Sequence, residues 1–181
     1  MRFRLPLKTL IETVAIVSKV VAAKGIKPIL ANLLITAQNG QLRFVGTDLE
    51  VMMISTIDAE IDVGGSFTIP AKLIQEIISS IPTDEDATVS FELSDPDANE
   101  ITIVSGRSKY TLQIQSIEEF PPVPVVETDD LPVFQAPGEA MSRALREAAV
   151  AMSLEEGNPV QKSICIDFSN HERPIMIAEE I

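Results

Sequence analysis

The side chains that could do nucleophilic or metal chemistry are few in this chain and lie far apart. His171 is the single histidine, and it stands in a predicted turn beside Asn170. Cys165 is the single cysteine and lies in an apolar alternating run, where we expect a small buried thiol in a reducing compartment. Because neither has a second ligand or catalytic partner nearby in sequence, we expect no zinc site, no Ser/His/Asp set, no other metal and no cofactor.

Two carboxylates, Asp48 and Glu50, offer the remaining route to catalysis. They follow Gly46-Thr47, where a predicted strand ends. A small hydrolase that uses these surface carboxylates is one hypothesis, but an aspartate at such a position usually shapes a turn. We therefore interpret Asp48 as structural and expect a protein that is not an enzyme.

Basic residues are concentrated at the N-terminal end of the chain. The whole chain has a net charge of −13, yet residues 1–30 carry +5 and the remaining residues −18. An acidic body with one basic segment can attract a polyanion along one face and repel it elsewhere. A helix with solvated lysines explains the same pattern, so charge alone leaves both interpretations open.

Apolar periodicity predicts the elements that must position these charges. Leu10, Val14 and Val17 form a stripe within a predicted helix at residues 8–23, and Pro70 opens a second helix at residues 71–81. Two helices against antiparallel strands make an α+β fold, in which the helices could pack side by side on one face of the sheet. No run of apolar residues is long enough for a membrane span. The predicted strands are 1–6, 33–37, 41–45, 51–57, 60–63, 66–69, 87–93, 100–105 and 108–114.

The order of apolar and polar positions repeats once, at an offset of 131 residues. Residues 27–35 align without a gap on residues 158–166. A period of this length indicates duplicated domains, because solenoid repeats are much shorter. A stretch rich in proline and acidic residues, 120–130, separates the copies. We therefore predict a complete domain at residues 1–125 and a partial second copy at residues 126–181.

Several separated motifs resemble those of a known family, the bacterial sliding clamp or beta subunit of DNA polymerase III. They occur in the family's order over about the first 120 residues, and the set is specific although each motif alone is weak. The motifs are Pro28-Ile29-Leu30 with Asn32-Leu33, Gly46-Thr47-Asp48-Leu49-Glu50, Ile69-Pro70-Ala71-Lys72, Ser105-Gly106-Arg107-Ser108 with Lys109-Tyr110, and Glu119-Phe120-Pro121.

The resemblance implies a DNA-clamp fold and a role in replication in the bacterial cytoplasm. Clamp subunits close head to tail into a homodimeric ring whose helices line the hole around duplex DNA. The ring tethers the polymerase without chemistry of its own, so the implied partners are double-stranded DNA of any sequence, DNA polymerase III subunits, the clamp loader and other clamp subunits, with no membrane. The resemblance implies Lys24 and Lys72 as DNA-binding residues, because they fall at basic positions of the family. Further candidates are Lys27, Lys19 and Lys8, which are weaker and rest on spacing alone, and Arg143 and Arg146, which lie on one side of the helix of the second copy.

The resemblance also implies an interface between subunits. The strand through residues 105–112 corresponds to the edge by which the family's first domain meets the third domain of the partner subunit. An exposed strand edge is a ready pairing site, although an ordinary edge strand with two solvated cations explains the same residues. The implied interface residues are Arg107, Lys109, Tyr110, Leu112 and Ile77.

The sequence departs from the family pattern after residue 177. The family's second domain carries a Thr-Asp-Gly-His-Arg segment where this sequence has Ala178-Glu179-Glu180-Ile181 and stops. An alternative hypothesis is therefore a truncated, clamp-derived module that binds a full clamp subunit without encircling DNA. The second copy has too few elements to cover its own apolar face, so we expect it to dock on another chain or to be poorly ordered. The side chains that need a cover are Ile164, Ile166, Phe168, Ile175 and Ile177.

Overall fold

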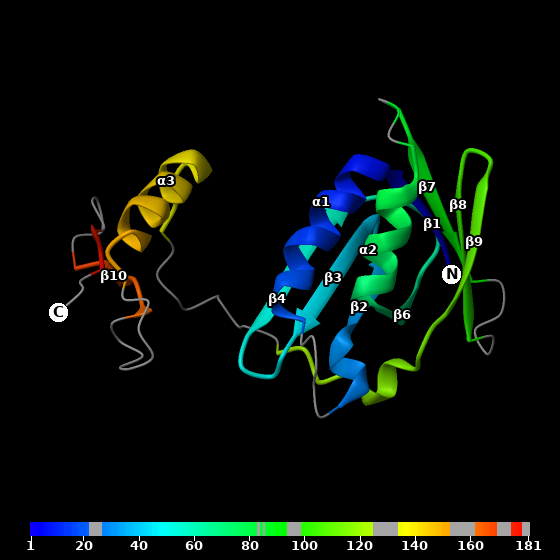
Figure 1. Ribbon diagram of the computed structural model, residues 1–181, viewed down its shortest axis with the longest axis horizontal. Helices are drawn as coiled ribbons and strands as arrows, with labels where there is room; N and C mark the ends of the chain where they lie inside the picture. Colours follow the sequence, from blue (N-terminus) through cyan, green and yellow to red (C-terminus); the bar gives the residue numbers. More distant parts are fainter. Residues whose placement is uncertain are drawn as a thin grey trace. The chain divides into compact units, whose positions relative to one another are not determined.

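Short alternating runs bounded by turn residues make strands the main element of the chain (Figure 1). The computed structural model describes residues 1–21, 27–82, 84, 86–93, 99–124, 134–152, 162–169 and 175–178. The chain folds as two compact units, Met1–Val123 and Pro124–Ile181. No helix among the described residues is both long and apolar enough to cross a membrane.

Nine strands of the first unit form two antiparallel sheets, where the sequence suggested one. The five-stranded sheet has the order β5-β1-β7-β8-β9, and the four-stranded sheet has the order β4-β3-β2-β6. The antiparallel α+β class is confirmed. The strands are β1 (Arg2–Pro6), β2 (Asn32–Gln38), β3 (Gln41–Thr47), β4 (Met52–Asp58), β5 (Glu60–Val63), β6 (Gly65–Pro70), β7 (Thr88–Glu92), β8 (Glu100–Ser105) and β9 (Ser108–Gln113).

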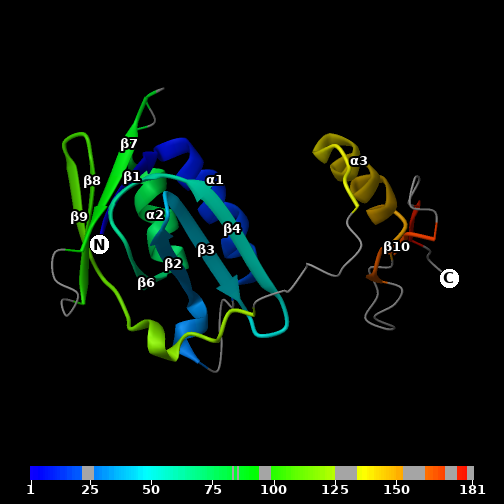
Figure 2. The ribbon, with the colours of Figure 1, turned by 180° about the vertical axis from the view of Figure 1, so that it is seen from behind.

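Two helices lie side by side on one face of the four-stranded sheet. Helix α1 spans Leu7–Val17 and α2 spans Ala71–Ser80. Figure 1 shows both helices in front of β2, β3 and β4, and the reverse view in Figure 2 shows them behind these strands. Helix α1 ends earlier than predicted, because the chain continues as a 3₁₀ turn at Ser18–Val20. Helices α1 and α2 therefore lie on one face of the sheet, as predicted, and we refer to these two helices as the helical wall.

The apolar stripe of α1 packs into a core shared with both sheets. Leu10, Val14 and Val17 are fully buried in the same cluster as Phe44 of β3 and Phe91 of β7. Phe91 also stacks on Phe3 of β1, with ring centroids 4.8 Å apart. The predicted periodicity therefore selected the face that the tertiary structure buries.

A glycine allows the C-terminal end of α1 to approach β3 closely. A Cβ atom added to Gly46 would lie 2.7 Å from the backbone oxygen of Val17 and 3.1 Å from its Cγ1 atom. Any larger residue would have to push helix and strand apart. The first residue of the Gly46–Glu50 motif is thus explained by helix–sheet packing.

A buried polar cluster joins the two sheets. Asn32 of β2 is 3% exposed, and its Nδ2 donates to Thr68 Oγ1 at 3.3 Å and to Gln115 Oε1 at 2.8 Å. Thr68 and Gln115 also exchange backbone hydrogen bonds. Because Gln115 follows β9 and Thr68 lies in β6, this cluster ties the end of β9 to the four-stranded sheet.

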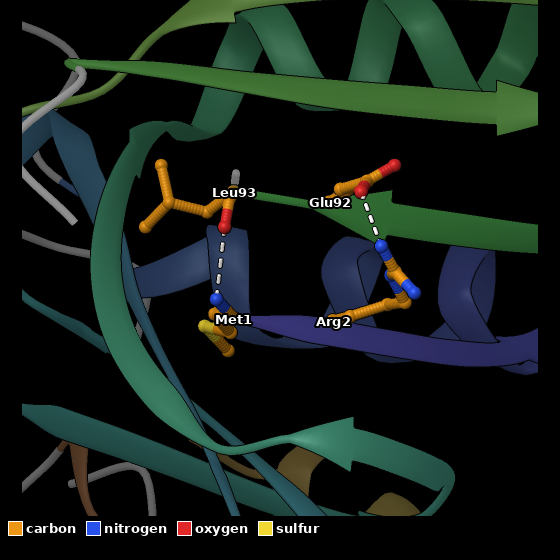
Figure 3. Close-up of polar contacts among 4 residues, drawn as sticks. All are labelled: Met1, Arg2, Glu92 and Leu93. Atoms are coloured by element: carbon orange, nitrogen blue, oxygen red, sulfur yellow. Dashed lines mark hydrogen bonds and ion pairs between the residues drawn. The ribbon is translucent and has the colours of Figure 1, made fainter. Parts of the chain in front are cut away.

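The first residue of the chain extends the pairing of β1 with β7 (Figure 3). The amino group of Met1 donates to the carbonyl oxygen of Leu93 at 2.9 Å, and Leu93 N donates back to Met1 O at 2.8 Å. Arg2 forms an exposed ion pair with Glu92 on the neighbouring strand. The N-terminal strand is therefore held firmly in the middle of its sheet.

The second unit repeats part of this order. It has a helix α3 (Gly138–Ala149) and a two-stranded antiparallel sheet of β10 (Cys165–Asp167) and β11 (Ile175–Ile177). Like α1 after Pro6, α3 follows a proline, Pro137, at the offset of 131 residues. Unlike α1, which follows β1, α3 has no strand before it among residues 134–137.

The expectation of a buried thiol is wrong, because Cys165 is exposed. The physical reason is the thinness of this unit: no residue of α3 is buried, and β10 and β11 have no second layer of sheet to cover them among the described residues. Ile166, Phe168, Ile175 and Ile177 are between 37% and 53% exposed. Phe168 finds one partner in an edge-on contact with Phe134, at 5.6 Å between ring centroids.

Candidate nucleic-acid interface and subunit edge

Three of the six predicted DNA-binding cations lie on helix α2, or within or beside the 3₁₀ turns of the first unit. Lys72 stands in the first turn of α2, Lys19 lies in the 3₁₀ turn after α1, and Lys27 precedes a second 3₁₀ turn at Pro28–Ala31. All three are exposed, as is Lys8 at the start of α1. Lys24 lies outside the described residues.

Two acidic side chains share the helical wall and moderate its charge. Glu76 lies one turn beyond Lys72, with 3.9 Å between Nζ and Oε1, and both side chains are largely exposed. Glu12 is exposed on α1. Exposed pairs of this kind contribute little to stability and are screened by salt, so Lys72 remains available to a stronger anion such as a phosphate.

The remaining predicted cations, Arg143 and Arg146, lie on α3 in the second unit. Both are exposed. Arg143 approaches Glu147 at 3.9 Å, and Arg146 Nη1 donates to Ser142 Oγ at 2.9 Å. These local contacts hold the two guanidinium groups along one helix, and their exposure leaves them accessible to a ligand.

The predicted interface strand, β9, lies at the edge of the five-stranded sheet. Ser105 pairs with Ser108 across the two-residue turn Gly106-Arg107, and Gly106 has a φ of +55°, which suits the first central position of a type II′ turn. Ile114 N donates to Asn99 O on the β8 side at 2.8 Å, whereas Gln115 N donates to Thr68 O on the other side.

Antiparallel pairing alternates along a strand, so this pattern identifies the free backbone groups of β9. Residues 108, 110 and 112 face β8, and Lys109, Thr111 and Gln113 direct their N–H and C=O groups outward. The side chains of these three residues are also exposed. Among the described residues, no strand pairs with this outer side of β9.

The structure brings Ile77 and Tyr110 together beside this edge. Both are partly buried against the main core, and Ser80 at the end of α2 contacts the Tyr110 hydroxyl at 3.2 Å between oxygens. Leu112 is only 8% exposed and belongs to the core itself. Leu112 thus packs the strand onto the core, whereas the side chains of Ile77 and Tyr110 are partly exposed.

The two basic residues of the edge differ in their surroundings. Arg107 lines an open hollow of about 380 Å³ together with Asp84 and Asp86, whereas Lys109 extends from the strand. Both side chains are exposed. Each is placed where an acidic partner chain could reach it.

Asp48 has a structural role, as the turn interpretation predicted. Its Oδ1 accepts hydrogen bonds from Glu50 N at 3.0 Å and Val51 N at 2.7 Å. These hydrogen bonds, above all the one from Val51, lower the pKa of Asp48. Thr47 Oγ1 accepts from Leu49 N and donates to Val51 O, and together these bonds hold Leu49 at a φ of +83°.

Sequence reasoning missed the residues that position the edge. Asn32 was part of a recognised motif, but nothing local to it indicated that it would reach Thr68 and Gln115. The available signal was a polar residue between Leu30 and Leu33, directly before the strand predicted at residues 33–37, because an amide that becomes buried must find partners.

Comparison with known proteins identifies this arrangement. The sequence profile of the family described as "DNA polymerase III beta subunit, N-terminal domain" matches residues 1–124. The beta sliding clamp of Caulobacter vibrioides is 33% identical over 131 residues, which cover 72% of this chain and 34% of that protein. The beta sliding clamp of Streptomyces coelicolor is 29% identical over 168 residues, which cover 93% of this chain and 42% of that protein.

Solved structures agree with the sequence matches. The beta subunit of DNA polymerase III from Caulobacter crescentus has a TM-score of 0.72 at 29% identity, covering 92% of this chain and 43% of that one. The DNA polymerase beta subunit of Streptococcus pyogenes has a TM-score of 0.81 and covers 99% of this chain and 47% of that one. At 22% identity, the Streptococcus match bears on the fold alone.

Two helices side by side on antiparallel sheets, with part of the pattern repeated, define a protein of the clamp class. The chain belongs to the family of the DNA polymerase III beta subunit, through the N-terminal domain of that family. It spans between about a third and two fifths of the length of the curated relatives cited above.

Proposed function

We propose that this chain acts as part of a DNA sliding clamp, a processivity factor that surrounds duplex DNA in the bacterial cytoplasm and tethers the replicative polymerase without chemistry of its own. The observation that carries this proposal is the helical wall with exposed cations, in a domain whose family match covers residues 1–124. The matches to sliding clamps favour this role over that of a module that only binds a full clamp.

DNA contact on this wall would depend on charge and not on sequence. Flexible lysines such as Lys19, Lys27 and Lys72 provide positive charge without bidentate geometry, which suits contacts that must slide along phosphates. Lys24 is proposed to act with them. Arg143 and Arg146 would add the same kind of contact from the second unit. Binding that releases counterions weakens steeply as salt is raised.

The open β9 edge would join this domain to another clamp domain. Its outward N–H and C=O groups at Lys109, Thr111 and Gln113 match the requirement for strand addition. Arg107 and Lys109 would select an acidic partner, and Ile77 with Tyr110 would supply apolar contact. The polymerase III subunits and the clamp loader are the further partners that family membership suggests.

A salt titration of DNA binding tests the first part of the proposal. Affinity of the chain for a fluorescent duplex should fall with salt, and the Lys72→Glu variant should bind more weakly with a shallower slope, by about one phosphate contact. Two unrelated duplex sequences should bind equally.

The matched control is Arg4→Glu, which changes the net charge equally. Arg4 lies on β1 between the core-facing Phe3 and Leu5, so its side chain leaves the sheet on the face away from the core, where it approaches Glu60 at 3.6 Å. Arg4→Glu should affect DNA binding much less than Lys72→Glu. Equal losses in both variants, or affinity independent of salt, would count against the helical wall as the DNA-binding surface.

A further inference from the structure

The four-stranded sheet has one face that the helical wall does not cover, and Figure 2 shows the sheet from that side. Residues alternate between the two faces of a strand, and Leu42 and Phe44 of β3 point into the main core. The side chain of Arg43, between them, therefore stands on the outer face. Arg43 is the one basic residue of these four strands, and it is only partly exposed.

Arg43 has no acidic partner in the part of the chain that the structure describes. None of the ion pairs or side-chain hydrogen bonds within the described ranges involves its guanidinium group. Asp58 is the single acidic residue of the four strands, and it accepts a hydrogen bond from Gln41 Nε2 at 3.2 Å. A cation that is partly withdrawn from water normally has an acidic partner, because its lost hydration must be replaced. The guanidinium group is therefore available to an anion from outside.

Hydroxyl groups flank Arg43 on both neighbouring strands. Thr36 of β2 stands opposite Arg43 on one side, and Thr56 of β4 stands opposite it on the other. Cβ atoms of such cross-strand neighbours are about 4.5–5.5 Å apart, so both threonines are within reach of a ligand that Arg43 binds. Ser66 of β6 donates to Thr36 Oγ1 at 3.0 Å, which leaves the Thr36 hydroxyl hydrogen able to donate. A guanidinium fork with hydroxyl donors beside it is a donor set suited to a carboxylate.

The next cross-strand row on the same face is apolar. It consists of Leu34, Val45 and Ile54. Val45 is 1% exposed because Phe120 packs in the same cluster, whereas Ile54 is 41% exposed. A ligand that carries a carboxylate close to an apolar group would therefore contact Arg43 and Ile54 together.

The spacing of these two side chains fits an extended peptide. Arg43 stands opposite Thr56, so Ile54 is its diagonal neighbour on β4. Diagonal neighbours are about 7–8 Å apart. Side chains at positions i and i+2 of an extended chain point the same way and are separated by about 6.6 Å, which is nearly the same distance.

We propose that the outer face around Arg43 and Ile54 is a binding site for an extended acidic peptide segment of a partner protein. Arg43 binds a carboxylate of the segment with help from Thr36 and Thr56, and Ile54 contacts an apolar side chain two residues away. Charge selects this partner, because the one cation of the sheet has no acid of its own among the described residues. The site lies on the face opposite the helical wall, so its test is independent of the DNA binding proposed above.

Fluorescence anisotropy with a synthetic peptide tests this proposal on the whole chain. The probe is the amidated peptide Leu-Ser-Glu-Ser-Leu with a label at its N-terminus, which places leucines two residues before and after the glutamate. Its counterpart, Leu-Ser-Gln-Ser-Leu, has no charge on the central side chain. The wild-type chain should bind the glutamate peptide about tenfold or more tightly than the glutamine peptide, because hydrogen bonds to a charged group are the stronger kind.

Three variants separate the contributions to this binding. Arg43→Gln should weaken binding of the glutamate peptide by about tenfold or more. Arg43→Lys should give an intermediate affinity, because it keeps the charge but loses the planar fork. Ile54→Ser should weaken binding of both peptides by roughly threefold, because it removes the apolar contact.

The matched control is Arg4→Gln, which removes the same charge from β1 of the other sheet. This variant should bind the glutamate peptide as the wild-type chain does. Equal losses in Arg4→Gln and Arg43→Gln would mean that net charge governs binding, and would overturn the proposal. So would equal affinity of the wild-type chain for the two peptides, or no binding of the glutamate peptide. Arg43 would then only cover apolar surface with its aliphatic stem.

Amide chemical shifts of the wild-type chain give a measure that does not depend on the folding of a variant. On addition of the glutamate peptide, the largest changes should occur at Thr36, Arg43 and Thr56 and at their neighbours on β2, β3 and β4. Changes centred on α1 and α2 would place the peptide on the opposite face and would also overturn the proposal.

Discussion

Replacement of Asn32 by alanine should destabilise the first unit and loosen its β9 edge. Asn32 Nδ2 donates two hydrogen bonds, one short to Gln115 and one longer to Thr68, and the side chain is 3% exposed. A net contribution of about 1 kcal/mol for each bond gives about 2 kcal/mol in all. The acceptor left without a partner on Gln115 adds little, because Gln115 is exposed and its Oε1 can turn to water.

The assay is equilibrium unfolding in urea, followed by circular dichroism. Asn32→Ala should lower the free energy of unfolding by about 2 kcal/mol, which for a domain of this size lowers the melting temperature by roughly 6–10 °C. Hydrogen exchange should also quicken around Gln115, because its backbone pairing with Thr68 loses support.

Gln41→Ala is the matched control. Its Nε2 also donates to a side chain, Asp58 Oδ1 at 3.2 Å, but this hydrogen bond is exposed. We expect a change within about 0.5 kcal/mol. If Asn32→Ala proved as mild as Gln41→Ala, the cluster of Asn32, Thr68 and Gln115 would not be what joins the two sheets.

Three further predictions follow from particular contacts. Gly46→Ala should lower the free energy of unfolding by about 1–3 kcal/mol, because the added Cβ atom meets the backbone oxygen of Val17. The control, Gly138→Ala, adds a Cβ atom that meets nothing within 4 Å and should be neutral or stabilising. Equal effects of the two variants in urea unfolding would contradict the close packing of α1 on β3. The lowered pKa of Asp48 implies a contribution to stability that is present above the ordinary aspartate pKa and is lost as the pH falls through the pKa of the folded state. The wild-type chain should therefore lose stability more steeply than Asp48→Asn between roughly pH 5 and pH 2. Parallel loss of stability in the two proteins on acid titration would refute this. Amide hydrogens of β10 and β11 should exchange fast in a dilute sample, because these strands lack a buried face. Full protection of Ile164–Ile177 in a monomer would instead show that the second unit is stable alone.

Much of the fold was predictable because its signals are local. Alternation in Gln41–Thr47 and Glu60–Val63 and the apolar stripe of α1 each arise from neighbours in sequence, and the strand and helix positions follow within a few residues. Helix α1 is shorter than its periodicity indicated, because the apolar pattern continues beyond a 3₁₀ turn to Val21, which packs partly buried against the same core.

The candidate site was predictable only in part. Charge and motif resemblance selected Lys19, Lys27 and Lys72, and the structure places them on the helices or their flanking turns in an exposed position. The position of β4 at the end of its sheet was not predicted. Whether a strand is an edge depends on which strands pair, and pairing between distant segments leaves no local trace in an alternating run.

The sequence by itself determined most element types and the split between a basic N-terminal segment and an acidic remainder, since these are properties of residue order and composition, and it predicts the duplication. Only the tertiary structure decided that the strands form two sheets, that Asn32 links them through Gln115, and that β4 and β9 are end strands of their sheets. The physical reason is that hydrogen-bond pairing and burial are satisfied between residues far apart in the chain, and several pairings satisfy the same local pattern equally well.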